Sequence, residues 1–253
     1  SDRKAVVETT AGRVRGFVSG GIHTFRGIPY AASTEGQARF VRPSGPAPWA
    51  GVRSAMHYGP TCPQGPRSGW KNDEEAFVFE WDDGQPGEDC LRVNVWTPGL
   101  NDNRKRPVLV WIHGGQFLSG SGQELKSYHG ERLSRRGDVV VVSLNHRLNV
   151  LGYLDLSAYG SRYADSANAG MLDIVAALEW VRARMWDDKV MATFTDVNNV
   201  GTAAAFSAGK LAMVEDGSWA LKSILENAPF RIGVAPIPAG PAGRVTLSTT
   251  DGF

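Results

Sequence analysis

The stretch VLVWIHGGQFLSGSG, from Val108 to Gly122, joins a continuous apolar run to two adjacent glycines. The run predicts a buried strand, and His113-Gly114-Gly115 would then present backbone N–H groups with no Cβ atom in front of them. Such groups stabilise the negative oxygen that forms in acyl transfer, and losing one donor typically raises the barrier by about 2.7–4 kcal/mol. The simpler alternative is a tight strand-to-loop turn that needs glycine only for its conformation.

The elements around this loop follow from local patterns. AVVETTAGRVRGFVS and GGIHTFRGIPYA predict an N-terminal antiparallel hairpin region, with turns at Ala11-Gly12 and Gly20-Gly21. LRVNVWTP alternates like a half-buried strand, whereas PVLVWIH and DVVVVSLNHRL are typical of central strands buried on both faces. Residues 168–184 predict a helix that carries most of its apolar residues on one face: Leu172, Val175, Ala176, Leu178, Trp180 and Val181. The pattern indicates the middle of an α/β sheet.

Composition limits the function classes. The chain has 253 residues, and 42% of them are hydrophobic, which suits a globular core. The formal net charge of +1 argues against a nucleic acid or an anionic membrane as partner and favours a small molecule. No apolar run approaches the roughly 20 residues of a membrane span, so no membrane association is expected. No closely spaced cluster of metal ligands is present in the sequence, so we expect neither a metal nor a cofactor.

The sequence has two cysteines, Cys62 and Cys90. Their spacing is equally compatible with one disulfide and with two buried thiols. The chain is expected to be secreted or periplasmic if the disulfide forms, and cytoplasmic otherwise.

Several segments, in order, resemble the type B carboxylesterase family of the α/β-hydrolase superfamily. The resemblance covers about residues 5–183. It rests on these strings: GRVRG, FRGIPYA, RF, YGPTCPQ, EDCLRVNVWTP, RPVLVWIHGGQFLSGS, GDVVVVSLNHRLNVLGYLDL and NAGMLDIVAALEWVR.

The resemblance implies roles for six residues. Gly114 and Gly115 would donate to the oxyanion, and Cys62 and Cys90 would form a disulfide. Glu88 would pair with Arg147 in a structural ion pair that holds the loop before one strand against the end of another. The fold implied is a truncated α/β-hydrolase sheet with an N-terminal hairpin.

After the helix, the resemblance changes. The family continues with a nucleophile elbow of the form G-E-S-A-G, and this string does not occur in the sequence. Residues from about 191 onward instead resemble sugar-binding proteins of ABC transporters, in AAFSAGKLAMVEDGSWALKSI and the strands that follow. We therefore expect a fusion with its junction between Arg182 and Val190. Residues 1–183 would form the esterase-like part, and residues 184–253 an α+β segment packed on it or completing its sheet.

Ser207 is the best candidate nucleophile, because AFSAG is an A-x-S-x-G version of the elbow. The alternative is that it belongs to a helix of the binding-protein segment. Ser119 and Ser121, in the glycine loop, are weaker candidates, since such loops often carry serine for turn chemistry.

His129 is the candidate base, in SYHGERL, where we expect it to be exposed in a loop. The four other histidines are interpreted as structural or as part of the glycine motif: His23, His57, His113 and His146. Two acidic residues, Asp155 and Asp173, lie in segments that match the carboxylesterase family well. Asp173, on the predicted helix, is expected to be structural.

The leading hypothesis is a serine-type carboxylic ester hydrolase that acts on small acyl esters. The rival is a non-catalytic hydrolase-like scaffold, or a sugar-binding fragment attached to one, because the family's acid and histidine would follow the junction. The truncated sheet would also leave a strand edge exposed, which predicts a homodimer through that edge.

Overall fold

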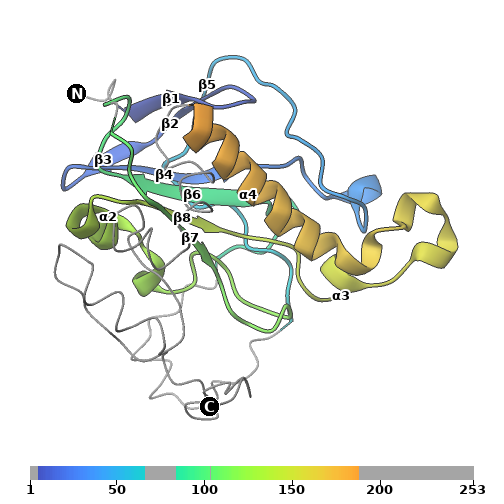
Figure 1. Cartoon of the computed structure of the whole chain (residues 1–253). Helices are drawn as coiled ribbons and strands as arrows, with labels where there is room; N and C mark the ends of the chain where they lie inside the picture. The colour runs from blue at the N-terminus through green and yellow to red at the C-terminus, as the bar shows by residue number, and fades with distance from the viewer. Residues whose placement is uncertain (1–4, 66–83, 103, 188–253) are drawn as a thin grey trace, which may run out of the picture. The chain divides into compact units, whose positions relative to one another are not determined.

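The computed structural model describes residues 5–65, 84–102 and 104–187 (Figure 1). All of them belong to the first of two compact units, which runs from Ser1 to Thr195. The expected segment of residues 184–253 lies outside the described residues from residue 188 onward, so its fold stays a prediction.

The described residues form two β-sheets. In the larger sheet the order is β3-β4-β6-β8-β7, and every neighbouring pair is antiparallel except the parallel pair of β8 and β7. The smaller sheet has the order β1-β2-β5. The strands are β1 (Val6–Glu8), β2 (Arg13–Arg15), β3 (Phe17–Ser19), β4 (Ile22–Pro29), β5 (Val52–Ser54), β6 (Arg92–Thr97), β7 (Val108–Ile112) and β8 (Val140–Leu144).

The N-terminal hairpins predicted from the turn residues are confirmed. β1 and β2 pair antiparallel across the first turn, where the Thr9 hydroxyl donates to the carbonyl of Gly12 at 2.7 Å. β3 and β4 pair across Gly20 and Gly21, whose φ values of 51° and 82° fit the two-residue turn that matches strand twist.

Burial of the central strands differs in part from the expectation. β8 is buried along its whole length, as predicted. β6 was expected to be half-buried, yet residues 93–97 are all buried, because β6 lies between β4 and β8 with side chains packed on both faces. β7 was expected to be central, but within the described residues it is the last strand of the sheet, and Trp111 and Ile112 are 39% and 43% exposed.

In the part of the chain that the structure describes, three α-helices accompany the sheets, and α4 lies across the larger sheet (Figure 1). The helices are α2 (Glu131–Gly137), α3 (Asn149–Tyr153) and α4 (Ala169–Asp187), and five short 3-10 turns lie at Gly36–Ala38, Lys126–Tyr128, Ser157–Tyr159, Ser161–Tyr163 and Ser166–Asn168. No helix of the described ranges is both long and apolar enough to cross a membrane.

The predicted helix over residues 168–184 is confirmed, but its buried face was predicted wrongly in part. Ile174, Ala177 and Val181 join the core with residues of β6 and β8. Val175 and Leu178, expected on the buried face, are 46% and 42% exposed. This helix carries apolar residues on most of its circumference, so the pattern alone does not decide which side meets the sheet.

The expected ion pair of Glu88 with Arg147 is wrong, because each residue has a different partner. Glu88 accepts two hydrogen bonds from the guanidinium of Arg39. The Arg147 guanidinium pairs with Asp173 of α4, with Nε to Oδ2 at 2.8 Å and Nη2 to Oδ1 at 2.7 Å, and the Arg147 backbone N–H also donates to this carboxylate at 3.0 Å. Both side chains are almost fully buried. The expected structural role of Asp173 agrees with this contact.

The buried pair gives a stability prediction. Asp173→Ala would leave the Arg147 guanidinium buried without its counter-ion, so we expect the free energy of unfolding to fall by about 3–5 kcal/mol. Asp165→Ala is the matched control: Asp165 pairs with Arg42 at 2.9 Å, and both side chains are largely exposed. Its loss should be about 0–1 kcal/mol. Urea unfolding followed by circular dichroism measures both, and equal losses would contradict the role assigned to Asp173.

Candidate functional site

The glycine loop follows β7 directly and turns sharply. Three successive residues have positive φ: Gly115 at 114°, Gln116 at 56° and Phe117 at 62°. For the two residues with side chains, this conformation costs of the order of 1–3 kcal/mol each. The N–H groups of Leu118 and Ser119 both donate to the Gly115 carbonyl, at 3.0 and 3.2 Å, and close the turn. Backbone strain of this kind is concentrated at functional sites.

Two glycines of the loop are required by close packing. A Cβ atom on Gly115 would lie 2.0 Å from the Ser119 carbonyl oxygen, and one on Gly120 would lie 2.5 Å from the Gly114 carbonyl oxygen. Gly114 differs, because no atom of the described residues lies within 4 Å of the position its Cβ would take. The loop therefore folds tightly on itself and leaves Gly114 open to an approaching molecule.

The same loop offers unused hydrogen-bond donors. Within the described residues, the backbone N–H groups of Gly114, Gly115 and Gln116 donate to no acceptor, and all three residues are exposed. The Phe117 carbonyl, in contrast, accepts from the Asn149 N–H at 2.7 Å, which ties the far side of the turn to the start of α3. Sequence reasoning named the two glycines and missed Gln116, since nothing in the sequence shows that a glutamine adopts a left-handed conformation here.

The imidazole of His113 holds the first peptide of this loop. Its Nδ1 lies 2.7 Å from the Gly114 carbonyl oxygen. A carbonyl oxygen can only accept, so Nδ1 carries the proton. A peptide unit is planar, with C=O and N–H pointing in opposite directions. Fixing the Gly114 carbonyl therefore also fixes the direction in which the Gly115 N–H points.

A second imidazole supports the first. The His113 ring stacks on the His146 ring, with centroids 4.8 Å apart and planes 9° from parallel. Burial and, to a smaller extent, the neighbouring His146 together lower the pKa of His113 to about 4. Burial also lowers the pKa of His146, whose Nδ1 donates to the Arg147 carbonyl at 3.0 Å. Both rings are therefore neutral near pH 7, and the stack carries no charge repulsion.

The other residues predicted from the sequence lie as follows. His129 is half-buried, with its ring beside those of Tyr58 and Trp96 at 5.7 and 6.4 Å, and neither of these belongs to the glycine loop. Ser207 lies outside the described residues, so its relation to the loop stays a prediction.

Both serines of the glycine loop take part in its own packing. The Ser119 carbonyl lies against Gly115. Ser121 is buried, and its hydroxyl oxygen accepts from the Gln123 N–H at 3.3 Å.

Cys62 and Cys90 are joined by a disulfide, as the family resemblance implied. Both cysteines are buried in the larger core, beside residues of the central strands. The described residues contain no group of three His, Cys, Asp or Glu side chains that could hold a metal ion.

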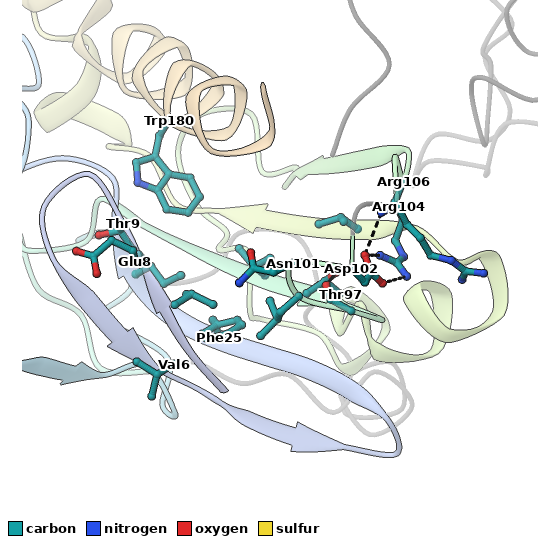
Figure 2. A pocket seen from close by; sticks show the side chains of 16 residues that line it. Val6, Glu8, Thr9, Phe25, Thr97, Asn101, Asp102, Arg104, Arg106 and Trp180 are labelled. Atoms are coloured by element: carbon teal, nitrogen blue, oxygen red, sulfur yellow. Dashed lines mark hydrogen bonds and ion pairs between the residues drawn. The ribbon is translucent and has the colours of Figure 1, made fainter. Parts of the chain in front are cut away.

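A separate cavity of about 340 Å³ lies beside α4 and the strand β1 (Figure 2). Trp180 projects from α4 at one end, and at the other Arg106 donates to the carboxylate of Asp102 at 2.6 and 2.9 Å. These hydrogen bonds lower the pKa of Asp102 to about 2. No residue of the glycine loop lines this cavity, so it is not part of the candidate site.

Comparison with known proteins gives a consistent result. A profile described as the carboxylesterase family matches residues 3–185. The para-nitrobenzyl esterase of Bacillus subtilis (strain 168) is 39% identical over 209 residues, which are 82% of this chain and 39% of that protein. The phenmedipham hydrolase of Pseudarthrobacter oxydans is 36% identical over 232 residues, which are 90% of this chain and 43% of that protein. The chain thus spans about two fifths of the length of these relatives.

Solved structures agree. An esterase from Clostridium hathewayi, described as able to hydrolyse aliphatic aromatic polyesters, has a TM-score of 0.65 and 49% identity, over 72% of this chain and 35% of that chain. A carboxylesterase of Geobacillus stearothermophilus has a TM-score of 0.61 and 43% identity, over 71% of this chain and 34% of that chain. The α/β-hydrolase fold expected from the sequence is confirmed.

The buried histidine stack predicts that stability depends on pH. The unfolded imidazole of His113 has its ordinary pKa of 6.5, whereas the folded one has a pKa of about 4. Between these values the unfolded state binds more protons, so the free energy of unfolding should fall as the pH falls, by up to about 3 kcal/mol. His113→Asn removes this titration and should flatten the dependence in urea unfolding between about pH 7 and about pH 4.5. In this variant His146, whose pKa is also lowered by burial, should still make the free energy of unfolding fall as the pH falls.

The matched control for this experiment is His57→Gln, at an exposed histidine. The free energy of unfolding of this variant should depend on pH as it does in the unmodified protein. A profile of the His113→Asn variant as steep as that of the control would contradict the assignment to the stack.

Proposed function

Because the chain belongs to the carboxylesterase family, we propose that it is a serine-type carboxylic ester hydrolase that acts on small acyl esters. The observation that carries the proposal is the glycine loop: an exposed, sharply turned segment whose N–H groups at Gly114, Gly115 and Gln116 are unused within the described residues. Exposed Phe117 and Leu118, beside these donors, offer an apolar contact for the acyl chain.

The proposed reaction is acyl transfer through a serine ester. The serine oxygen attacks the ester carbonyl as a base takes its proton, and the carbonyl oxygen, now negative, accepts hydrogen bonds from the loop N–H groups. The alcohol leaves with that proton, and water then releases the acid by the same route. Ser207 is the proposed nucleophile and His129 the proposed base, on the sequence arguments given above.

The C-terminal segment enters the proposal in two ways. Residues 184–253 would supply the nucleophile, and their resemblance to transporter sugar-binding proteins makes a bound sugar the alternative.

The disulfide supports a further part of the proposal, that the protein works in an oxidising compartment and is secreted or periplasmic.

Hydrolysis of para-nitrophenyl acetate and butyrate tests the proposal. We expect turnover by the purified chain and its loss in Ser207→Ala. Gly115→Ala should lower kcat by about 10²–10³-fold, because its Cβ would meet the Ser119 carbonyl oxygen and displace the donors. The matched control is Gly45→Ala, at an exposed glycine whose Cβ position has no atom of the described residues within 4 Å, and this variant should keep full activity.

The results of these assays distinguish catalysis by Ser207 from catalysis by another serine and from a non-catalytic protein. Full activity in Ser207→Ala would remove that serine and direct the search to Ser119 and Ser121. No turnover by the unmodified chain, together with saturable binding of a sugar, would favour the non-catalytic alternative.

We propose a homodimer through the outer edge of β7. Within the described residues no strand pairs with this edge, and unpaired edges tend to associate. Light scattering after size-exclusion chromatography should give the mass of a dimer. Ile112→Lys should give a monomer, because a charged side chain on an edge strand opposes pairing. Val18→Lys, on the opposite edge strand β3, is the control and should stay dimeric; a monomeric unmodified chain would contradict the proposal.

A further inference from the structure

The side-chain amide of Gln64 both donates to and accepts from the main chain of the glycine loop. Its Oε1 accepts from the Gly120 N–H at 2.7 Å, and its Nε2 donates to the Gly120 carbonyl at 3.1 Å. The same Nε2 also donates to the Cys62 carbonyl at 3.1 Å. A glutamine amide is suited to this arrangement because it carries a donor and an acceptor at one end.

The segment that carries Gln64 is itself fixed. Cys62, two residues earlier, is bonded to Cys90, which lies just before the central strand β6 and is fully buried. Asn149 Nδ2 donates to the Pro63 carbonyl at 3.0 Å, and Asn145 Nδ2 donates to the Pro60 carbonyl at 3.2 Å. Gln64 therefore projects from an anchored main chain.

The contact at Gly120 reaches the proposed oxyanion donors through direct packing. The position of a Cβ on Gly120 lies 2.5 Å from both the Gly114 carbonyl oxygen and His113 Nδ1. A fixed Gly120 main chain therefore limits how far the Gly114 carbonyl can move. Since the peptide between Gly114 and Gly115 is planar, the direction of the Gly115 N–H is limited as well.

We propose that Gln64 is a positioning residue for the oxyanion donors: it clamps Gly120, and through Gly120 it fixes the peptide that joins Gly114 to Gly115. The inference rests on the proposed ester hydrolysis. Gln64 makes no contact with substrate in this role and acts only through the loop. The free energy that a positioned donor contributes appears in the transition state, so loosening the loop should lower kcat and leave KM unchanged.

Two variants test the clamp. Gln64→Ala removes all three hydrogen bonds. Gln64→Glu keeps the length and an acceptor for the Gly120 N–H, but it cannot donate and brings a carboxylate against the Gly120 and Cys62 carbonyls. We expect kcat for para-nitrophenyl butyrate to fall by about 10–100-fold in both, with KM within about twofold of the unmodified value. Gln85→Ala, at an exposed glutamine within the same disulfide loop, is the matched control and should retain full activity.

Hydrogen exchange measured by mass spectrometry provides a readout that does not need turnover. Exchange in peptides over residues 113–122 should rise in both Gln64 variants and stay unchanged in Gln85→Ala, while exchange in α4 stays unchanged in all of them. Unchanged kcat or unchanged loop exchange in Gln64→Ala would overturn the inference. Faster exchange in α4 as well would also overturn the inference, because the variant would then have destabilised the whole fold and not the loop alone.

The exchange measurement separates this inference from the proposed function. If the unmodified chain has no turnover, the ester hydrolase proposal fails. Faster exchange confined to residues 113–122 in the Gln64 variants would still support the clamp, and its absence would overturn it.

Discussion

The buried ion pair of Arg147 and Asp173 is the contact on which the site depends most. Removing two charges from water costs several kcal/mol each, so the pair is tolerated only with close, complete hydrogen bonding. Here one carboxylate receives the Arg147 backbone N–H and two of its guanidinium nitrogens. The pair joins the end of β8 to α4 and fixes the residue just before it. That residue is His146, and the ring of His113 stacks on its ring. The first residue of the glycine loop is therefore packed against a residue that the buried ion pair holds in place.

The glycine loop combines strain with several independent supports. Gln116 and Phe117 occupy a left-handed conformation that is unfavourable for residues with side chains. One support comes from the loop's own first residue, His113, on the Gly114 carbonyl, and two come from other segments: Asn149 on the Phe117 carbonyl and Gln64 on Gly120. Together they offset the cost of this conformation, and residues 114–116, whose N–H groups have no acceptor among the described residues, are exposed.

Local patterns in the sequence were enough to predict the hairpins, the buried strand β8 and the long helix α4, because turns, apolar runs and helical periodicity are short-range properties. They did not reveal that β6 is central and β7 lies at an edge of the described sheet, since strand order depends on pairing between distant segments. The partners of Glu88 and Arg147 were missed for the same reason: an ion pair depends on which side chains meet in three dimensions. Gln64 and Gln116 both lie in strings that carry the family resemblance, but their residue type alone did not indicate a contact with Gly120 or a left-handed conformation.

The supports of the loop have one common property: all of them lie between Pro60 and Asp173, these two residues included. The proposed donors Gly114 and Gly115 and the contacts that support their loop therefore all lie within the described residues. In acyl transfer, preorganised donors contribute most when they need no reorganisation during the reaction, and the cost of orienting them is met as the protein folds. Folding of this part already fixes the direction of the Gly115 N–H group through the Gly114 carbonyl. What the proposed reaction still requires is a serine from the rest of the chain, together with a base, for which His129 is proposed, beside this loop.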